Sequence, residues 1–280
     1  MKRKMLIAVL LVCALVMTAC GGSGDGGENQ TGNQEDGALS GTVSLNGSTS
    51  VEKVIGALSE AFMDNYPDVK ITYDPTGSGS GISAVSNSTA DIGLSSRELK
   101  ADETGLTATV FALDGIAVVV HPENPVADLT LEQIAGLANG TIRNWSEVGG
   151  ADGDVVLIGR EAGSGTRDGF ESIAGVEDEC VYQQELNSTG AVIAAVSANP
   201  LAVGYASLAS VNDTVKAVAV EGVEATEDTV LDGTYVLQRN FNFITNDSVE
   251  SSEAAKAFIE YAKSPEARDI IAKAGAVQPQ

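Results

Sequence analysis

Short apolar runs alternate with amphipathic segments along most of this chain, and that alternation restricts the possible folds more than any other feature. The run Gly115–His121 is continuous and rich in β-branched residues, as in a strand covered on both faces. Val51–Met63 instead repeats apolar residues at helical spacing. Alternating strands and helices predict an α/β domain built on a central sheet.

The same patterns place the remaining elements of this domain. Further strands are expected at residues 43–45, 69–73, 90–94, 155–159, 202–206 and 240–244. Further helices are expected at residues 82–87, 131–137, 166–173, 190–198, 252–263 and 265–274. The acidic segment 221–228 is expected to be a surface loop, because a run of like charge is usually solvated.

The first residues have the pattern of an export signal. Lys2, Arg3 and Lys4 precede an apolar run, Met5–Val16, and small residues follow it before Cys20. The run has about 12 residues, short of the roughly 20 that cross a bilayer as a permanent helix. Residues 1–19 are therefore predicted to be a signal peptide rather than a membrane anchor.

Val16–Gly21 resembles the lipobox of bacterial lipoproteins, although Met17 stands where leucine is usual. The resemblance implies that Cys20 receives a lipid, which would hold the chain on the outer face of the cell membrane. Plain secretion with a free or paired Cys20 is the alternative. Residues 20–38 are polar and glycine-rich, so we expect a flexible tether. The folded body then begins near Leu39.

Charge and cysteine content exclude several classes of protein. The formal net charge of −23 repels nucleic acid and anionic lipid headgroups. It also repels anions at long range, so any anion site must work through short-range hydrogen bonds and helix dipoles. Apart from Cys13 in the signal and Cys20, the chain has only Cys180, so no disulfide is expected within the mature body.

Three clusters of Ser, Thr and Gly each follow a predicted strand and open a predicted helix. They are Asn46–Ser50, Thr76–Gly81 and Gly163–Thr166. The first N–H groups of a helix have no intrahelical partner, and the helix dipole favours an anion there. One such cluster alone is usually only a helix cap. Three together predict an anion site, and none of them matches a nucleotide-binding loop.

Two charged residues are candidates for the same site. Arg160 ends a predicted strand just before the third cluster and can direct a fork of donors at an anion, although a surface ion pair is the alternative. Asp91 begins a predicted strand and could accept the proton that phosphate carries near neutral pH and sulfate lacks. A site that demands this proton would reject sulfate.

The sequence resembles the phosphate-binding proteins of high-affinity phosphate ABC importers, the PstS family. The resemblance rests on Gly47–Ser50, Gly77–Gly81, Ala90–Gly93 and Arg160–Thr166, whose order and spacing match. It implies a two-lobed type II periplasmic-binding-protein fold with phosphate in the interlobe cleft. The phosphate-binding residues that it implies are Thr49, Ser50, Ser78, Asp91, Arg160, Ser164, Gly165 and Thr166. Some family members have an acidic residue at the position of Ala162.

The resemblance also implies a domain layout and partners. One lobe would comprise residues 39–109 plus 240–280 and the other residues 110–239, with two crossings as the hinge. The partners would be inorganic phosphate and the membrane permease subunits of an ABC importer, without cofactor or metal. We expect a monomer.

Rival functions remain open. Ser50–Lys53 matches the S-x-x-K motif of serine hydrolase-type enzymes, but the partner motifs are missing, and His121 is more typical of a strand end than of a catalytic base. A related fold could instead bind sulfate, molybdate or tungstate, against which Asp91 argues. Trp145 is expected to pack within a lobe.

Overall fold

The computed structural model of the protein describes residues 39–279. The predicted signal peptide, Cys20 and the predicted tether lie outside these residues. The segment Ala38–Gln280 forms one compact unit. No helix among the described residues is both long and apolar enough to cross a membrane.

Strands and helices alternate as the sequence patterns predict. The first part contains β1 (Gly41–Gly47), α1 (Glu52–Asn65), β2 (Val69–Pro75), α2 (Ser78–Ser86) and β3 (Ile92–Ser95). The middle contains β4 (Leu106–Val120), α3 (Leu131–Asn139), β6 (Val156–Arg160), α4 (Gly165–Ala174), β7 (Gln184–Leu186), α5 (Thr189–Ser197) and β8 (Ala202–Ser207). The last part contains α6 (Glu227–Leu231), β11 (Gln238–Asn246), α7 (Glu253–Lys263) and α8 (Pro265–Lys273). Short elements are β5 (Asp128–Leu129), β9 (Lys216–Ala217), β10 (Ala219–Val220), η1 (Thr49–Val51), η2 (Trp145–Val148) and η3 (Leu208–Ser210).

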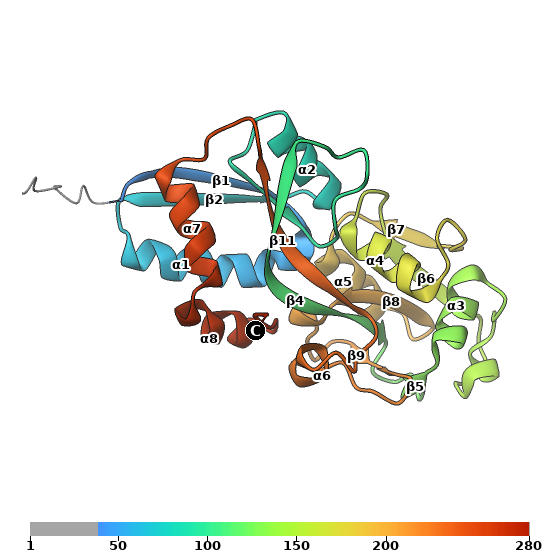
Figure 1. Cartoon of the computed structure of the whole chain (residues 1–280). Helices are drawn as coiled ribbons and strands as arrows, with labels where there is room; N and C mark the ends of the chain where they lie inside the picture. The colour runs from blue at the N-terminus through green and yellow to red at the C-terminus, as the bar shows by residue number, and fades with distance from the viewer. Residues whose placement is uncertain (1–38, 280) are drawn as a thin grey trace, which may run out of the picture. The chain divides into compact units, whose positions relative to one another are not determined.

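One mixed sheet runs through the molecule in the order β2-β1-β3-β11-β4-β8-β6-β7, with β9 beside β4. The strands β1, β2 and β3 are parallel to one another, as are β6, β7 and β8. Between these two groups, β11 is antiparallel to both β3 and β4. The strand β4 pairs first with β11 and then, from Ile116 onward, with β8, so it belongs to both halves of the sheet. Figure 1 shows β4 and β11 side by side through the middle of the molecule.

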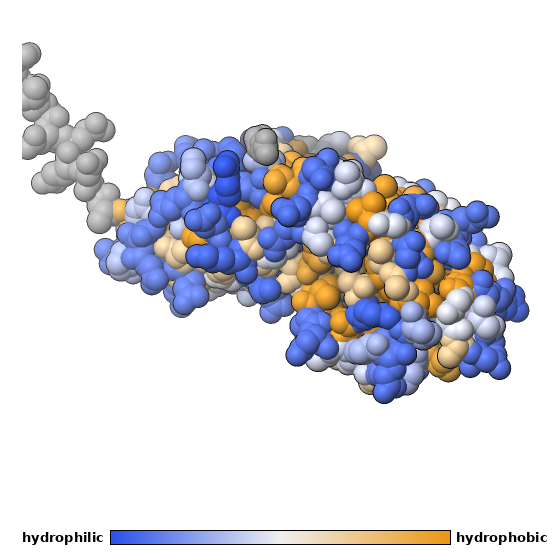
Figure 2. All heavy atoms as spheres, turned by 90° about the horizontal axis from the view of Figure 1, so that it is seen from below, coloured by the Kyte–Doolittle hydropathy of each residue, from blue (hydrophilic) through white to orange (hydrophobic). Residues whose placement is uncertain are grey.

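Separate hydrophobic cores stabilise the two halves. The first core takes its buried residues from 43–112 and 241–276, with Ala209 added, and includes the stacked pair Phe111 and Phe243 at 4.2 Å between ring centroids. The other two cores take theirs from 116–237. Trp145 lies in the second core, and its indole N–H donates to the Leu201 carbonyl at 2.9 Å. Figure 2 shows a largely hydrophilic face, on which apolar side chains gather toward the half that carries α3 and α6.

Three of the differences from the sequence predictions have a clear physical reason. The long strand begins at Leu106 rather than Gly115, because its first residues are only partly buried and show no continuous apolar run. The helix predicted from Ile82 begins at Ser78, although Gly and Ser are weak helix formers, because Ser78 and Gly81 are buried against neighbouring loops. The acidic segment predicted as a loop ends in α6, which Thr226 caps through the N–H of Thr229.

Candidate anion-binding site

Helix starts from both halves of the sheet meet at one place. The loops that follow β1, β2, β6 and β7 lead into η1, α2, α4 and α5. The strand β1 is parallel to β2, and β6 is parallel to β7, so within each half the loops that follow the strands lie at the same edge of the sheet. Open α/β sheets bind ligands at the carboxyl ends of their strands. Each helix start brings N–H groups without intrahelical partners and a positive dipole end.

Seven hydroxyl groups gather at this point, and we call them the hydroxyl cluster. Each of these residues is at most 3% exposed. The cluster consists of Ser48, Thr49, Ser50, Ser78, Ser96, Thr166 and Thr189.

Hydroxyls of the first predicted loop contact those of the opposite half directly. The Oγ of Ser50 lies 2.6 Å from Oγ1 of Thr166 and 3.2 Å from Oγ1 of Thr189. The backbone N–H of Thr189 donates to Oγ1 of Thr49 at 3.2 Å. A bridge of hydroxyls therefore spans the two halves, and each hydroxyl can rotate to donate or accept.

The second predicted loop joins the cluster through Ser78 and the end of β3. The Oγ of Ser78 accepts from the N–H of Ser96 at 3.1 Å, and the Oγ of Ser96 accepts from that of Ser48 at 2.9 Å. The N–H of Gly79 donates to the carbonyl of Gly163 across the two halves at 3.0 Å. All three predicted loops therefore lie together.

Glycine at position 47 is what allows these loops to approach so closely. Gly47 has φ of 146°, in a region that L side chains rarely adopt, and a Cβ there would lie 2.1 Å from the carbonyl oxygen of Leu94. Its own carbonyl accepts from the N–H groups of Thr76 and Gly77 at 2.8 Å each. The loop after β1 thus holds the loop after β2 in place.

Arg160 lies beside the cluster at 1% exposure, so its ion pair is not the surface pair that the sequence left open as an alternative. Its Nη1 donates to Oγ1 of Thr189 at 3.1 Å, while Nε and Nη2 donate to the carboxylate of Glu161 at 2.9 Å each. Glu161 therefore balances the charge of Arg160. The next residue, Ala162, is the position at which the sequence lacks an acid. The guanidinium is pre-oriented, with one edge toward the hydroxyls.

A buried network fixes the backbone of Arg160. Its N–H donates to the Tyr205 hydroxyl at 3.1 Å, and that hydroxyl lies 2.8 Å from the hydroxyl of Tyr182. Burial raises the pKa of both tyrosines, so they stay neutral donors and acceptors. Arg167 donates to the Arg160 carbonyl at 3.1 Å and to Glu171 at 2.7 Å. The strand end that carries Arg160 is therefore rigid.

Ser164 and Gly165 occupy the start of α4. The Oγ of Ser164 caps the helix by accepting from the N–H of Arg167 at 3.4 Å. Gly165 lies so close to the other half that a Cβ there would be 2.5 Å from Oγ of Ser78 and 2.7 Å from Oγ of Ser96. The start of α4 thus faces the second loop, as the sequence pattern predicts.

Asp91 does not join the cluster, and its prediction as a site residue is corrected here. The side chain is exposed, and its Oδ2 accepts from the N–H and Oγ of Ser44 at 2.7 Å each. The reason is its position before Ile92, at the amino end of β3, whereas the cluster lies at carboxyl ends. A strand of four residues separates the two ends by roughly 13 Å.

Sequence reasoning missed Ser96 and Thr189. Ser96 directly follows β3, and Thr189 stands in Ser188–Gly190, a fourth Ser/Thr/Gly cluster between a strand and a helix. The pattern used for the other three clusters could have found Thr189. Nothing in the local sequence distinguishes Ser96 from its neighbour Ser95.

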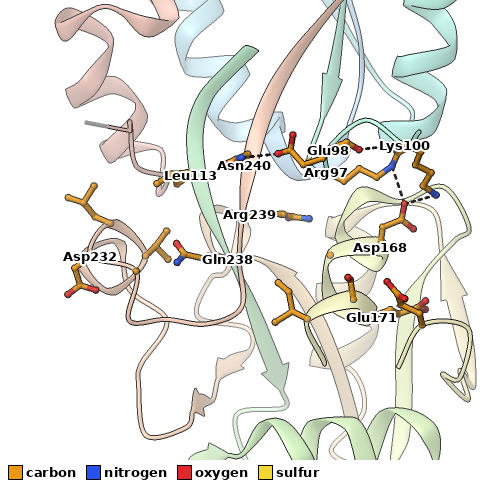
Figure 3. Close-up of a pocket in the computed structure, with 18 of the residues that line it drawn as sticks. Arg97, Glu98, Lys100, Leu113, Asp168, Glu171, Asp232, Gln238, Arg239 and Asn240 are labelled. Carbon is orange, nitrogen blue, oxygen red and sulfur yellow. Dashed lines mark hydrogen bonds and ion pairs between the residues drawn. The ribbon is translucent and has the colours of Figure 1, made fainter. Parts of the chain in front are cut away.

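A cavity of about 900 Å³ opens beside the cluster, with Ser96 in its wall. Figure 3 shows its side chains, among them Asp168 on α4 facing Arg97 and Lys100 from the loop after β3. Asp168 Oδ2 lies 3.0 Å from Nε of Arg97 and 3.0 Å from Nζ of Lys100. These ion pairs join the two halves of the sheet at the edge of the site.

In the described part of the chain, the side chains of Ser50 and Lys53 do not form a nucleophile–base pair. The Nζ of Lys53 donates to the Ala209 carbonyl at 3.2 Å, so the S-x-x-K pattern of Ser50 and Lys53 forms no such pair. Between residues 39 and 279, no group of His, Cys, Asp and Glu side chains could hold a metal ion. The arrangement presents hydrogen-bond donors from two sides to a small anion.

Comparison with known proteins identifies the family of this chain. The family model of the PBP superfamily domain matches residues 32–266. The phosphate-binding protein PstS of Bacillus subtilis is 30% identical over 283 residues, which cover 97% of this chain and 92% of that protein. The chain belongs to the PstS family.

Other members of the PstS family extend this result. PstS of Borreliella burgdorferi is 30% identical over 247 residues, covering 83% of this chain and 88% of that protein. A crystal structure with bound phosphate, of a Clostridium perfringens substrate-binding protein assigned to phosphate ABC transport, is 41% identical. It superposes with a TM-score of 0.83 and covers 86% of this chain and 100% of that one. The fold is that of the periplasmic binding proteins.

Proposed function

We propose that this protein binds inorganic phosphate in the hydroxyl cluster and delivers it to an ABC importer. The observation that carries the proposal is the convergence of helix starts, hydroxyls and Arg160 from both halves of the sheet on one buried point. The ligand contacts in this proposal are those predicted from the sequence other than Asp91: Thr49, Ser50, Ser78, Arg160, Ser164, Gly165 and Thr166. The PstS relatives named above support phosphate as the ligand.

Binding would work by closure of two lobes. We assign residues 39–109 plus 240–280 to one lobe and residues 110–239 to the other, with β4 and β11 as the crossings between them. The division of the hydrophobic cores near the same positions supports these boundaries. Phosphate that contacts donors from both lobes binds the closed state better and shifts the population toward it. The permease subunits would then recognise the closed shape.

Residues 1–38 supply the attachment in this proposal. Residues 1–19 would direct export, Cys20 would carry the lipid, and residues 20–38 would tether a monomeric body to the outer face of the membrane. Growth in labelled palmitate tests the anchor: label should enter the full chain and be absent from its Cys20→Ala variant. Equal labelling of both would show that the lipid is not on Cys20.

Isothermal titration of the unit Ala38–Gln280, freed of bound anions, tests the ligand. We expect one phosphate per chain, bound with an affinity that does not depend on any added metal or cofactor. A folded protein that ignores phosphate would contradict the proposal, and titrations with molybdate and tungstate would then identify the oxyanion.

A further inference from the structure

The carboxylates near the hydroxyl cluster pair with other groups or lie away from the cluster. Glu161 spends both oxygens on Arg160. Asp168 pairs with Arg97 and Lys100, as Figure 3 shows. Glu52, at the start of α1, is exposed, and Asp91 lies at the far end of β3. Within residues 39–279, no carboxylate accepts a hydrogen bond from a hydroxyl of the cluster.

Ser96 directly follows β3, at the end of the strand that reaches the hydroxyl cluster. It is fully buried, and its Oγ lies 2.9 Å from Oγ of Ser48 and 3.2 Å from Oγ of Ser78. A Cβ on Gly165 would lie 2.7 Å from the same oxygen, so Ser96 faces the start of α4 across the site. Its hydroxyl can donate to an anion or accept from it.

Whether a hydroxyl or a carboxylate faces the ligand decides whether the site can bind an anion that carries no proton. A buried carboxylate facing the anion would need a ligand O–H, and a fully ionised ligand would leave two like charges unpaired. Sites that require such a partner reject analogues lacking it by about ten-thousand-fold or more. A cluster of rotatable hydroxyls, helix N–H groups and one arginine imposes no such requirement, because every hydroxyl can turn its proton toward the ligand.

We propose that this site accepts tetrahedral oxyanions whether or not they carry a proton, sulfate as well as phosphate, and that Ser96 is the specificity-determining residue. The inference rests on the proposed function, since it concerns the same site. It is the opposite of the rejection of sulfate that Asp91 predicted from the sequence alone. The ligand class is thus set by size and tetrahedral shape rather than by protonation.

Competing titrations of the unmodified unit Ala38–Gln280 with phosphate and sulfate at neutral pH give the first test. We expect sulfate to bind within about a hundredfold of phosphate, since hydrogen-bond-dependent rejection is missing. Tight phosphate binding with no detectable sulfate binding overturns this inference and leaves the proposed function standing. Failure of both anions to bind overturns the proposed function and the inference with it.

Two substitutions at position 96 test the residue. Ser96→Asp should raise the phosphate-to-sulfate affinity ratio by about a hundredfold or more, because the new carboxylate needs a ligand proton. Ser96→Ala should weaken both anions by about tenfold and leave their ratio unchanged. If Ser96→Asp does not fold, the unmodified protein and Ser96→Ala still decide the matter, because unchanged affinities in Ser96→Ala would remove Ser96 from the site.

Two controls separate the site from its surroundings. Ser80→Asp places the same charge on the exposed first turn of α2, outside the cluster. Asp91→Asn removes the carboxylate that the sequence pattern favoured. Neither variant should change the phosphate-to-sulfate ratio by more than about twofold. A large change in the ratio for Asp91→Asn would return the discriminating role to Asp91 and overturn the inference.

Discussion

At the scale of single residues, Arg160 is the one buried cation that touches the hydroxyl cluster in the described part of the chain. Burying a charge is costly unless it is paired, and Glu161 supplies the pair from the side away from Thr189. The arginine therefore keeps one donor edge for an anion, while the net charge of the pair is close to zero. Most of the free energy of anion binding in the proposed site must then come from hydrogen bonds rather than from long-range electrostatic attraction.

Replacing Arg160 with alanine should weaken phosphate binding by about 2–3 kcal/mol, which is roughly a hundredfold, because a charge-assisted donor is lost. Isothermal titration measures the loss. Arg143→Ala is the matched control, since Arg143 is exposed and its guanidinium donates to the nearby Gly140 carbonyl. Equal affinities of the two variants would place Arg160 outside the binding contacts.

Cys180 is half-buried, and burial raises the pKa of its thiol to about 11. The thiolate is the reactive form, so at pH 8 the native thiol should react about a hundredfold more slowly than an ordinary cysteine of pKa near 9. The rate should rise about tenfold per pH unit up to that pKa. Labelling of Ala38–Gln280 with an aromatic disulfide reagent checks this, and the denatured chain, which should react at the ordinary rate, is the reference.

At the scale of elements, the proposed site draws its hydrogen-bond donors from four helix starts. Each contributes N–H groups and a fraction of a positive charge, without the strong desolvation cost of a lysine. The helix α4 is the clearest case, because its first residue, Gly165, touches hydroxyls of the opposite half. A side chain at this position would collide with the hydroxyls of Ser78 and Ser96.

Gly165→Ala should weaken phosphate binding without lowering the stability of the fold. Alanine favours helix over glycine by about 1 kcal/mol, so the melting temperature should hold or rise. Phosphate affinity should nevertheless fall by at least about a hundredfold, because the new Cβ collides with Ser78 and Ser96 when the halves come together. Gly190→Ala, in the first turn of α5, is the control, since a Cβ there meets nothing within 4 Å. Loss of affinity in both variants would point to a general effect on helix starts.

At the scale of the whole molecule, β4 and β11 hold the two halves together and polar contacts join them around the site. Asp114 on β4 and Arg239 on β11 form a buried ion pair, with 2.9 Å between Oδ2 and Nη2. Asp168 adds a contact between the halves through Arg97 and Lys100. The first pair fixes the crossing strands, while the second can form only when the halves are close.

Asp168→Asn should therefore weaken phosphate binding about fivefold, near 1 kcal/mol, by removing partly exposed ion pairs that favour closure. The difference from the unmodified protein should shrink as salt is raised, since screening weakens such pairs. Glu185→Gln serves as the control, because Glu185 pairs with Arg167 within one half. A salt-independent loss for Asp168→Asn would show that the ion pairs do not act through closure.

The sequence by itself determined the α/β class, the alternation of elements and three of the four loops that form the site. Each of these follows from local patterns: apolar periodicity reports burial, and Ser/Thr/Gly clusters report helix starts. The sequence also made Arg160 a candidate, from its place at a strand end just before the third cluster, but no local pattern could show that it is buried next to Glu161.

Only the tertiary structure decided which end of β3 reaches the hydroxyl cluster. Asp91 and Ser96 flank the same short strand, and both carry side chains suited to an anion site. Pairing of β3 with β1 sends the carboxyl end of the strand, and with it Ser96, into the cluster. The same pairing leaves Asp91 at the opposite edge beside Ser44. Strand direction within a sheet is a non-local property, and here it determines that a hydroxyl rather than a carboxylate joins the cluster.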